Sequence, residues 1–225
     1  MPDPATSAAV SPSRRKFLRN VATTAGTASL LSASEPSQEI KVGLVGCGGR
    51  GTGAAAQALQ ADDFAVLTAV ADIEQQRIDR CLEAVAGRHE GKQKVRVAKQ
   101  HQFLGLDAFQ GVIDSGVDVV LLATPPGFRP QHLKACIEAG KHVFCEKPMA
   151  VDVPGVRSVL ETADLAGRKR LSLVAGFCWR YNNMISEAMD RVHSGEIGDI
   201  VAYYATSYSS PVKPMPPASR RPGAL

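Results

Sequence analysis

An α/β fold with a doubly wound parallel sheet is the fold class that the 225-residue sequence predicts. From residue 40 onward, short apolar runs alternate with segments of helical spacing, and such alternation builds a parallel sheet covered by helices. The runs are continuous and rich in Val, Leu and Ala, which is typical of strands buried on both faces. A glycine-rich turn leads directly from the first run into a helical segment.

The strands of this sheet are expected at six apolar runs, of which the third is the weakest. These runs cover residues 42–45, 64–71, 95–98, 117–123, 142–145 and 171–176. Helices are expected where apolar residues recur at helical spacing, as at Ile78, Leu82 and Val85. They cover residues 51–59, 74–86, 105–115, 130–139 and 153–166. A further helix at residues 181–193 and an alternating strand at 199–209 are expected to begin a second, α+β domain.

The composition indicates a globular protein with a hydrophobic core and argues against a role in binding nucleic acid. Apolar residues make up 44% of the chain, and the mean hydropathy is -0.07. The net charge is only +4 and aromatic residues amount to 5%, so no basic aromatic surface for DNA or RNA is expected. The 5 cysteines show no CxxC spacing, which favours buried reduced thiols over a metal site or disulfides.

The turn after the first strand carries the spacing G-x-G-x-x-G at Gly46, Gly48 and Gly51. The first glycine permits a tight turn, the second lets the backbone approach a pyrophosphate, and the third lets helix and strand pack closely. Unpaired N–H groups at the start of the helix, around Gly49 and Arg50, offer a site for phosphate. The turn is therefore predicted to bind a dinucleotide; the alternative is a glycine-rich turn without a ligand.

Asp72 supports the dinucleotide interpretation because it ends the second strand, 21 residues after Gly51 (72 − 51). An acid at that place hydrogen-bonds the ribose hydroxyls of the cofactor. A carboxylate there also repels a 2′-phosphate, so NAD is predicted in preference to NADP. Arg77 lies too far along the chain to reverse this preference, whereas Arg50 is still able to contact a phosphate.

Two loops at the carboxyl edge of the sheet are expected to complete the site. Thr124 and Pro125 follow the fourth strand, where the hydroxyl can hydrogen-bond a nucleotide, although the pair also fits an ordinary loop. Glu146 and Lys147 follow the fifth strand, where the ammonium can polarise a substrate hydroxyl or carbonyl. The alternative is a solvated Glu–Lys pair. Pro148 directly after the lysine is compatible with a cis peptide bond.

The motifs and their order resemble the glucose–fructose oxidoreductase / inositol dehydrogenase / MocA (Gfo/Idh/MocA) family over residues 40–210. The matching segments are KVGLVGCGGRG, VADI, VVLLATPP, AGKHVFCEKPMA and VAGFCWRYN. The resemblance implies a Rossmann fold that binds NAD(P), with Asp72 on the adenosine ribose and Lys147, the catalytic residue, beside the nicotinamide and the substrate. It also implies that Arg180 approaches the cofactor side of the cleft.

The residues predicted to bind cofactor share a place at the carboxyl edge of the sheet or in a family motif. They are Gly46, Gly48, Gly49, Arg50, Gly51, Asp72, Thr124, Pro125, Glu146, Lys147 and Arg180. No metal site is predicted. His132 and His142 are expected to be structural groups, and Trp179 is expected either to wall the cleft or to belong to the core.

The chain divides into three predicted parts. Residues 39–178 form the dinucleotide-binding domain, and residues 179–225 form a connecting helix and the first strand of a truncated second domain. Residues 1–38 are rich in Ala, Ser, Thr and Pro and include SRRKFL at residues 13–18, which predicts a twin-arginine signal and a periplasmic location. The alternative is a disordered basic tail on a cytoplasmic protein. The segment is too short and polar to span a membrane.

The predicted function is NAD(P)-dependent hydride transfer to or from a sugar-like or polyol-like substrate, with this chain supplying mainly the dinucleotide-binding domain. Two alternatives stay open: an NAD-dependent glycosidase of the same family, and a catalytically incomplete nucleotide-binding fragment. The resemblance implies that the acid–base pair for proton transfer lies in a second domain. It also implies that full-length members are homo-oligomers.

Overall fold

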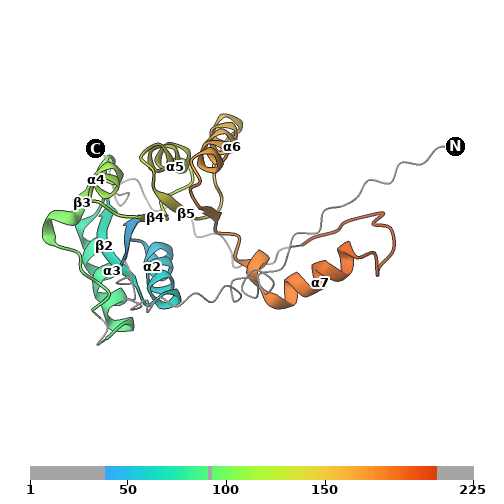
Figure 1. Cartoon of the computed structure of the whole chain (residues 1–225), viewed down its shortest axis with the longest axis horizontal. Helices are drawn as coiled ribbons and strands as arrows, with labels where there is room; N and C mark the ends of the chain where they lie inside the picture. The colour runs from blue at the N-terminus through green and yellow to red at the C-terminus, as the bar shows by residue number, and fades with distance from the viewer. Residues whose placement is uncertain (1–38, 91–92, 207–225) are drawn as a thin grey trace, which may run out of the picture. The chain divides into compact units, whose positions relative to one another are not determined.

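The computed structural model describes residues 39–90 and 93–206 and contains a six-stranded sheet (Figure 1). The strands are β1 (Ile40–Val45), β2 (Ala65–Asp72), β3 (Gln102–Leu104), β4 (Val119–Leu122), β5 (His142–Cys145) and β6 (Leu173–Ala175). They pair in parallel in the order β3-β2-β1-β4-β5-β6. The direction of winding reverses between β1 and β4, so the predicted doubly wound Rossmann fold is confirmed.

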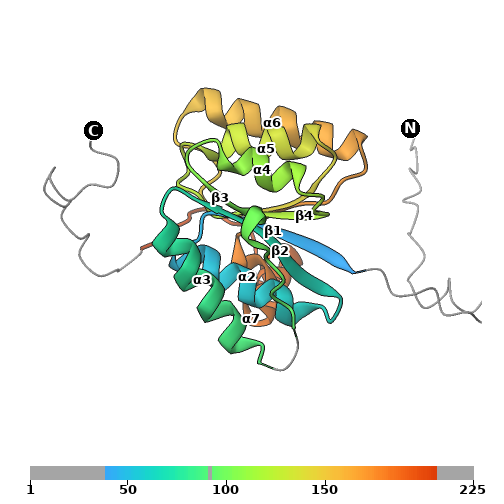
Figure 2. The same cartoon turned by 90° about the vertical axis from the view of Figure 1, so that its left-hand side faces the viewer.

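Helices cover both faces of this sheet. They are α2 (Gly49–Ala61), α3 (Gln75–Arg88), α4 (Ala108–Asp114), α5 (Arg129–Glu138) and α6 (Val153–Arg168). The chain also forms the short 3-10 turns η1 (Lys99–His101) and η2 (Cys178–Tyr181) and a helix α7 (Asn183–His193), which lies apart from the sheet (Figure 1). Figure 2 shows α4, α5 and α6 on one face and α2 and α3 on the other. The carboxyl ends of the parallel strands therefore meet at one edge, between the two helical layers.

The sequence pattern explains the two halves of the core. In α3, Ile78, Cys81 and Val85 recur at helical spacing and are buried, whereas most positions between them are exposed. They join one buried cluster, while a second cluster beneath α4 and α5 includes Leu133 and Ile137. Each such aliphatic side chain contributes about 1.5–3 kcal/mol of folding free energy when it leaves water.

The predicted third strand is wrong in position. Residues 95–98 make only an isolated bridge, between Val95 and Leu67, and the strand that pairs with β2 is β3. The apolar pattern marks residues 95–98 because their valines are partly buried. Pairing is instead fixed by Phe103, whose ring packs so closely on α4 that a Cβ at Gly111 would lie 2.4 Å from it.

The predicted strand at residues 199–209 does not form where the structure describes it. Residues 199–206 adopt no regular secondary structure, and residues 207–209 lie outside the described part of the chain. Val201 and Tyr203 are exposed over 94% and 89% of their surface. An apolar, alternating segment becomes a strand only when a neighbour accepts its backbone hydrogen bonds, and no described strand pairs with this one.

The other expected strands and helices are confirmed, with ends displaced by a few residues. The helix expected at residues 181–193 is α7. The predicted export signal at residues 1–38 lies outside the described residues. Among the helices that are described, none has the length and apolar character needed to cross a bilayer.

Close packing of α4 on β1 depends on a glycine. A Cβ added at Gly43 would lie 2.5 Å from Val112 Cγ1 of α4 and 3.2 Å from Val117 Cγ1. Neither valine is free to move away, because both are almost fully buried.

The substitution Gly43→Ala is therefore expected to destabilise the domain by about 1–3 kcal/mol through overpacking. Gly87→Ala is the matched control, because Gly87 lies near the exposed end of α3 and its Cβ would meet nothing within 4 Å. The control is expected to stabilise by about 0.5–1 kcal/mol, the usual gain in a helix. Urea unfolding followed by circular dichroism measures both, and equal effects of the two substitutions would contradict this packing.

Candidate functional site

The turn between β1 and α2 requires glycine at two of its positions. Gly46 has φ +98, and a Cβ there would lie 2.9 Å from the backbone of Ala123 and Thr124. A Cβ at Gly51 would lie 1.8 Å from the carbonyl oxygen of Gly46. The tight turn and the close helix–strand packing predicted for these two glycines are therefore present in the structure.

The middle of the turn is open rather than packed. A Cβ at Gly48 or Gly49 would meet no atom within 4 Å. Gly48 is the N-cap of α2 and provides no side chain to satisfy the first N–H groups of the helix. These N–H groups and the positive end of the helix dipole face a space that a phosphate fits.

Asp72 binds the same turn from the end of β2. Its Oδ2 accepts a hydrogen bond of 2.7 Å from the backbone N–H of Cys47. Its Oδ1 accepts from the N–H groups of Ile73 at 2.7 Å and Glu74 at 3.2 Å. The carboxylate therefore fixes the glycine turn relative to β2, and Oδ2, with a single donor, keeps a further lone pair for a ligand hydroxyl.

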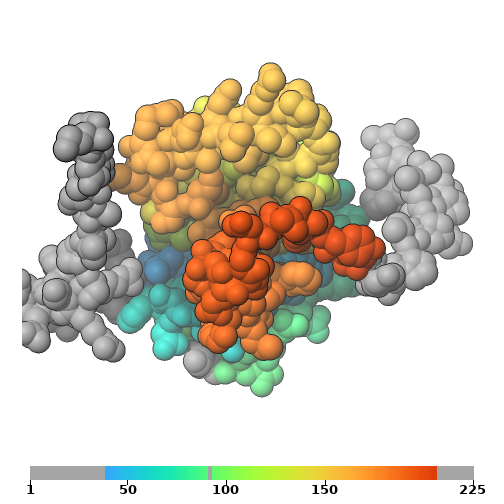
Figure 3. Space-filling view, turned by 90° about the vertical axis from the view of Figure 1, so that its right-hand side faces the viewer, coloured from blue at the N-terminus to red at the C-terminus, as the bar shows by residue number. Residues whose placement is uncertain are grey.

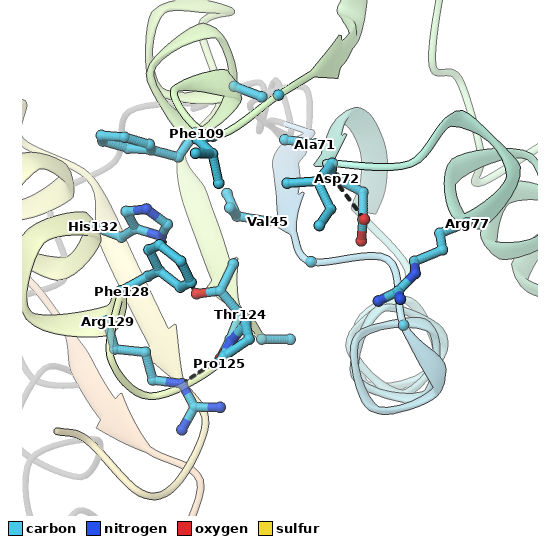
Figure 4. A pocket seen from close by; sticks show the side chains of 17 residues that line it. Val45, Ala71, Asp72, Arg77, Phe109, Thr124, Pro125, Phe128, Arg129 and His132 are labelled. Atoms are coloured by element: carbon cyan, nitrogen blue, oxygen red, sulfur yellow. Dashed lines mark hydrogen bonds between the residues drawn. The ribbon is translucent and has the colours of Figure 1, made fainter. Parts of the chain in front are cut away.

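A cavity of about 340 Å³ opens above the turn. Five of the predicted residues line it: Gly46, Gly48, Asp72, Thr124 and Pro125. In the close-up, Asp72 and Arg77 stand on one side, and Thr124 and Arg129 stand on the other (Figure 4). The lining is largely apolar between these polar groups, as is usual for a site that holds a flat organic ligand.

Arg77, which the sequence places too far along the chain to reverse the preference for NAD, lies at the cavity. It lines the cavity beside Asp72, and its guanidinium forms an ion pair of 3.0 Å with Glu74. The chain turns into α3 at Gln75, so that the first helical turn brings Arg77 back towards the end of β2.

On the side of the cavity opposite Asp72, His132 contacts two other residues that line it, Phe109 and Thr124. Its ring stacks on Phe109 with centroids 4.1 Å apart, and its Nδ1 lies 3.3 Å from the Thr124 hydroxyl. Burial lowers the pKa of His132 to about 4, so the ring is neutral at pH 7. The prediction that His132 is a packing group is confirmed, and the group also orients Thr124.

Glu146 and Lys147 follow β5, the strand next to β4. Glu146 is 2% exposed, and its Oε1 accepts a hydrogen bond of 2.6 Å from Arg50 Nε, with a second Arg50 nitrogen, Nη2, in contact. This partner raises the pKa of Arg50. Lys147 is exposed, and its peptide bond to Pro148 is cis, as the sequence suggested. Glu146 and Arg50 thus join the fifth strand to the first turn of α2.

Arg180 and Trp179 lie away from this cavity. The Arg180 guanidinium stands 5.6 Å from the ring centroid of Phe177, and Arg180 is not among the residues that line the cavity. Trp179 is 75% exposed, so neither predicted environment for it is found in the described residues. Both residues belong to η2, which follows the last strand of the sheet, β6.

The remaining predictions concern groups outside the cavity. His142 Nδ1 accepts from the Ser172 N–H at 2.9 Å, which confirms a structural role. Cys47, Cys81, Cys136 and Cys145 are buried free thiols as predicted, whereas Cys178 is exposed. No group of three His, Cys, Asp or Glu side chains suited to a metal ion occurs in the described ranges 39–90 and 93–206.

The comparisons with known proteins agree with this geometry. A family model described as "Oxidoreductase family, NAD-binding Rossmann fold" (GFO_IDH_MocA) matches residues 40–173. The chain is 29% identical over 159 residues to a myo-inositol 2-dehydrogenase of Thermotoga maritima, covering 71% of this chain and 42% of the relative. It is 27% identical over 163 residues to a glycosyl hydrolase family 109 protein of Shewanella amazonensis, covering 72% of this chain and 34% of the relative.

A solved structure shows the same similarity. The scyllo-inositol dehydrogenase from Lactobacillus casei with bound NAD(H) and scyllo-inositol aligns with a TM-score of 0.57 at 25% identity. The alignment covers 72% of this chain and 43% of that protein. The chain therefore spans less than half the length of the proteins that it matches.

The neutral state of His132 has a consequence for acid stability. Its pKa is about 4 when folded against 6.5 when exposed, so the unfolded chain binds a proton in this range that the folded chain does not. The free energy of unfolding is therefore expected to fall by up to about 3 kcal/mol as the pH is lowered from 6.5 to 4. In His132→Gln this part of the decrease is expected to vanish, whereas the exposed His193→Gln keeps it. Urea unfolding at several pH values checks this, and an unchanged slope in His132→Gln would refute the assignment.

Proposed function

Since this chain belongs to the Gfo/Idh/MocA oxidoreductase family and contains its NAD-binding domain, we propose that it serves an NAD-dependent dehydrogenase of a sugar-like or polyol-like substrate. The relatives in the comparison are inositol dehydrogenases for the most part, which supports a polyhydroxylated ring as substrate class. The reaction of the whole protein is hydride transfer between a carbinol carbon and the nicotinamide.

The observation that carries this proposal is the glycine turn with Asp72 attached to it. The open cradle at Gly48 and Gly49 fits a pyrophosphate, and Oδ2 of the Asp72 carboxylate beside it can accept a hydrogen bond from a ribose hydroxyl. Exposed Ile73, the residue after Asp72, and exposed Leu106 also line the cavity and offer apolar surface for adenine. NAD, when bound, supplies the hydride acceptor or donor.

The residues after β4 and β5 would hold the other end of the cofactor. Thr124 lines the cavity next to the turn, and β5 ends beside β4 at the same sheet edge. Lys147 stands at that edge with its side chain exposed, where its ammonium can donate a hydrogen bond to a substrate oxygen as charge develops there. We propose that the acid–base group that transfers the proton lies in the part of the longer relatives with which this chain does not align.

The preference for NAD rests on charge. A 2′-phosphate would lie next to the Asp72 carboxylate, and like charges so close cost several kcal/mol. Arg77 reduces this penalty because it lines the same cavity, although Glu74 already occupies part of its guanidinium. NADP is therefore the weaker ligand of the two.

An NAD-dependent glycosidase is a second candidate, supported by the similarity to the glycosyl hydrolase family 109 protein. Such a reaction would return the hydride within each turnover, so the cofactor would stay bound and show no net reduction. NAD that copurifies with the protein and is not consumed during turnover would favour this candidate over a dehydrogenase. The third alternative, a binding fragment without catalysis, predicts NADH binding and no activity.

Part of the surface of this domain suits a further domain or a second subunit. Figure 3 shows α6, drawn in yellow and orange, on the outside of the molecule. Its residues Val153, Val156 and Leu160 are exposed together with Val151, just before the helix. An apolar strip of this kind usually marks an interface, and we propose that it is covered in the homo-oligomer expected for the full-length family.

We also propose that the chain is exported by the twin-arginine route. The support is the pair Arg14 and Arg15 directly before Phe17 and Leu18, followed by a weakly apolar, small-residue segment. Export after folding would allow NAD to be loaded in the cytoplasm. In a bacterial host, a reporter fused to residues 1–38 is expected in the periplasm, and Arg14→Lys with Arg15→Lys is expected to keep it in the cytoplasm. Equal distribution of both fusions would contradict export.

Titration of the 225-residue chain with NADH and NADPH, followed by nicotinamide fluorescence, tests the proposed cofactor site. The chain is expected to bind NADH more tightly than NADPH, and Asp72→Asn is expected to lower that preference about tenfold by removing one like charge. Loss of the Cys47 hydrogen bond would weaken the binding of both cofactors alike. The ratio of the two dissociation constants therefore reports the effect of the Asp72 charge alone. Asp79→Asn, on the outer side of α3, is the control and is expected to leave the ratio unchanged. No binding of either cofactor at millimolar concentration would overturn the proposal.

A further inference from the structure

Arg129 is a buried cation in a place where a positive charge is unfavourable. It is 6% exposed and is the first residue of α5, at the positive end of the helix dipole. Burial lowers the pKa of its guanidinium, although the charge of the Glu146 carboxylate acts in the opposite direction. Among the described residues no carboxylate forms a direct ion pair with Arg129. A buried charge that is not paired directly with a counterion weakens a fold unless its hydrogen bonds compensate.

Those contacts are three backbone carbonyl groups on two loops. Arg129 Nε donates to the Thr124 carbonyl at 2.8 Å, in the loop after β4. Its Nη1 donates to the Glu146 carbonyl at 2.6 Å and also to the Pro148 carbonyl, in the loop after β5. The two acceptors on the second loop are the residues directly before and after Lys147. Figure 4 shows the guanidinium reaching across to Thr124.

The backbone on the N-terminal side of Lys147 is held at a second point. The Glu146 carboxylate is buried and pairs with Arg50 from the first turn of α2. A Cβ at Gly176 would lie 3.0 Å from Glu146 Oε2, so the carboxylate also packs closely on the chain after β6. Glu146 is thus fixed through its side chain by Arg50 and through its carbonyl by Arg129, while the Lys147 side chain remains exposed.

We propose that Arg129 is a positioning residue that fixes the backbone of Lys147 and of Thr124, so that both present their side chains to the nicotinamide half of the cofactor. The proposal rests on the proposed function, because it takes that half of NAD to lie at the ends of β4 and β5. Arg129 itself need not touch the reacting atoms.

Arginine suits this task and lysine does not. The guanidinium is planar and carries five N–H donors in a fixed fork, so it can reach carbonyl groups on two loops at once. A lysine ammonium is a single nitrogen on a flexible stem and can serve one loop or the other from the same position. Arg129→Lys therefore keeps the charge and much of the apolar stem but removes the link between the loops.

The experiment compares two probes on the full 225-residue chain: NADH, which reaches both ends of the site, and ADP-ribose, which lacks the nicotinamide. Arg129→Lys is expected to weaken NADH binding about tenfold and to change ADP-ribose binding by less than about twofold. Arg157→Lys, an exposed position on α6, is the matched control and is expected to change neither. Circular dichroism and urea unfolding confirm that each variant is folded.

A double-mutant cycle with Lys147→Ala distinguishes positioning from general support of the fold. If Arg129 acts through Lys147, most of the loss of NADH affinity caused by Arg129→Lys is expected to disappear in the Lys147→Ala background. Additive losses would overturn the proposal, as would equal weakening of both probes. Loss of the folded state in both Arg129→Lys and Arg129→Met would also overturn it, because Arg129 would then support the domain as a whole. Failure of the unsubstituted chain to bind either probe would instead refute the proposed cofactor site.

Discussion

The close approach of α2 to the end of β1 is the constraint on which the rest of this structure depends. A Cβ at Gly51 would lie 1.8 Å from the Gly46 carbonyl oxygen, so the helix can begin this near the strand only with glycine there. The first N–H groups of the helix are thereby held at the carboxyl edge of the sheet, beside open space. Asp72 then ties the turn to the neighbouring strand through the Cys47 N–H.

Two arginines extend this arrangement to the other half of the sheet. Arg50 lies in the first turn of α2 and pairs with Glu146 after β5, while Arg129 joins the loops after β4 and β5. The ends of β1, β4 and β5 are thus connected by charge-assisted hydrogen bonds across the point where the winding reverses. A site fixed in this way before the ligand arrives loses less conformational entropy when the cofactor binds.

Local sequence patterns predicted the features of the fold that depend on residues close together in the chain. The alternation of apolar runs and the spacing of Gly46, Gly48 and Gly51 were sufficient for the fold and the turn. They could not place β3, because its residue Phe103 packs on Gly111 of α4, and this tertiary contact leaves no local pattern in the sequence. They did not single out Arg129, because its hydrogen bonds join two loops that are far apart in the sequence. An exposed segment such as residues 199–206 needs a partner strand before its pattern has an effect.

The most direct test of the central claim, that the glycine turn and Asp72 form a dinucleotide site in this chain, is an NMR titration of the ¹⁵N-labelled protein with NAD. The largest amide shifts are expected on Gly48, Gly49 and Arg50, and the Cys47 amide is expected to shift through its hydrogen bond to Asp72. A second group of shifts is predicted around Thr124 and Lys147, and this group should be weak with ADP-ribose. Shifts confined to other surfaces, or no shifts at millimolar NAD, would show that the glycine turn and Asp72 do not form this site.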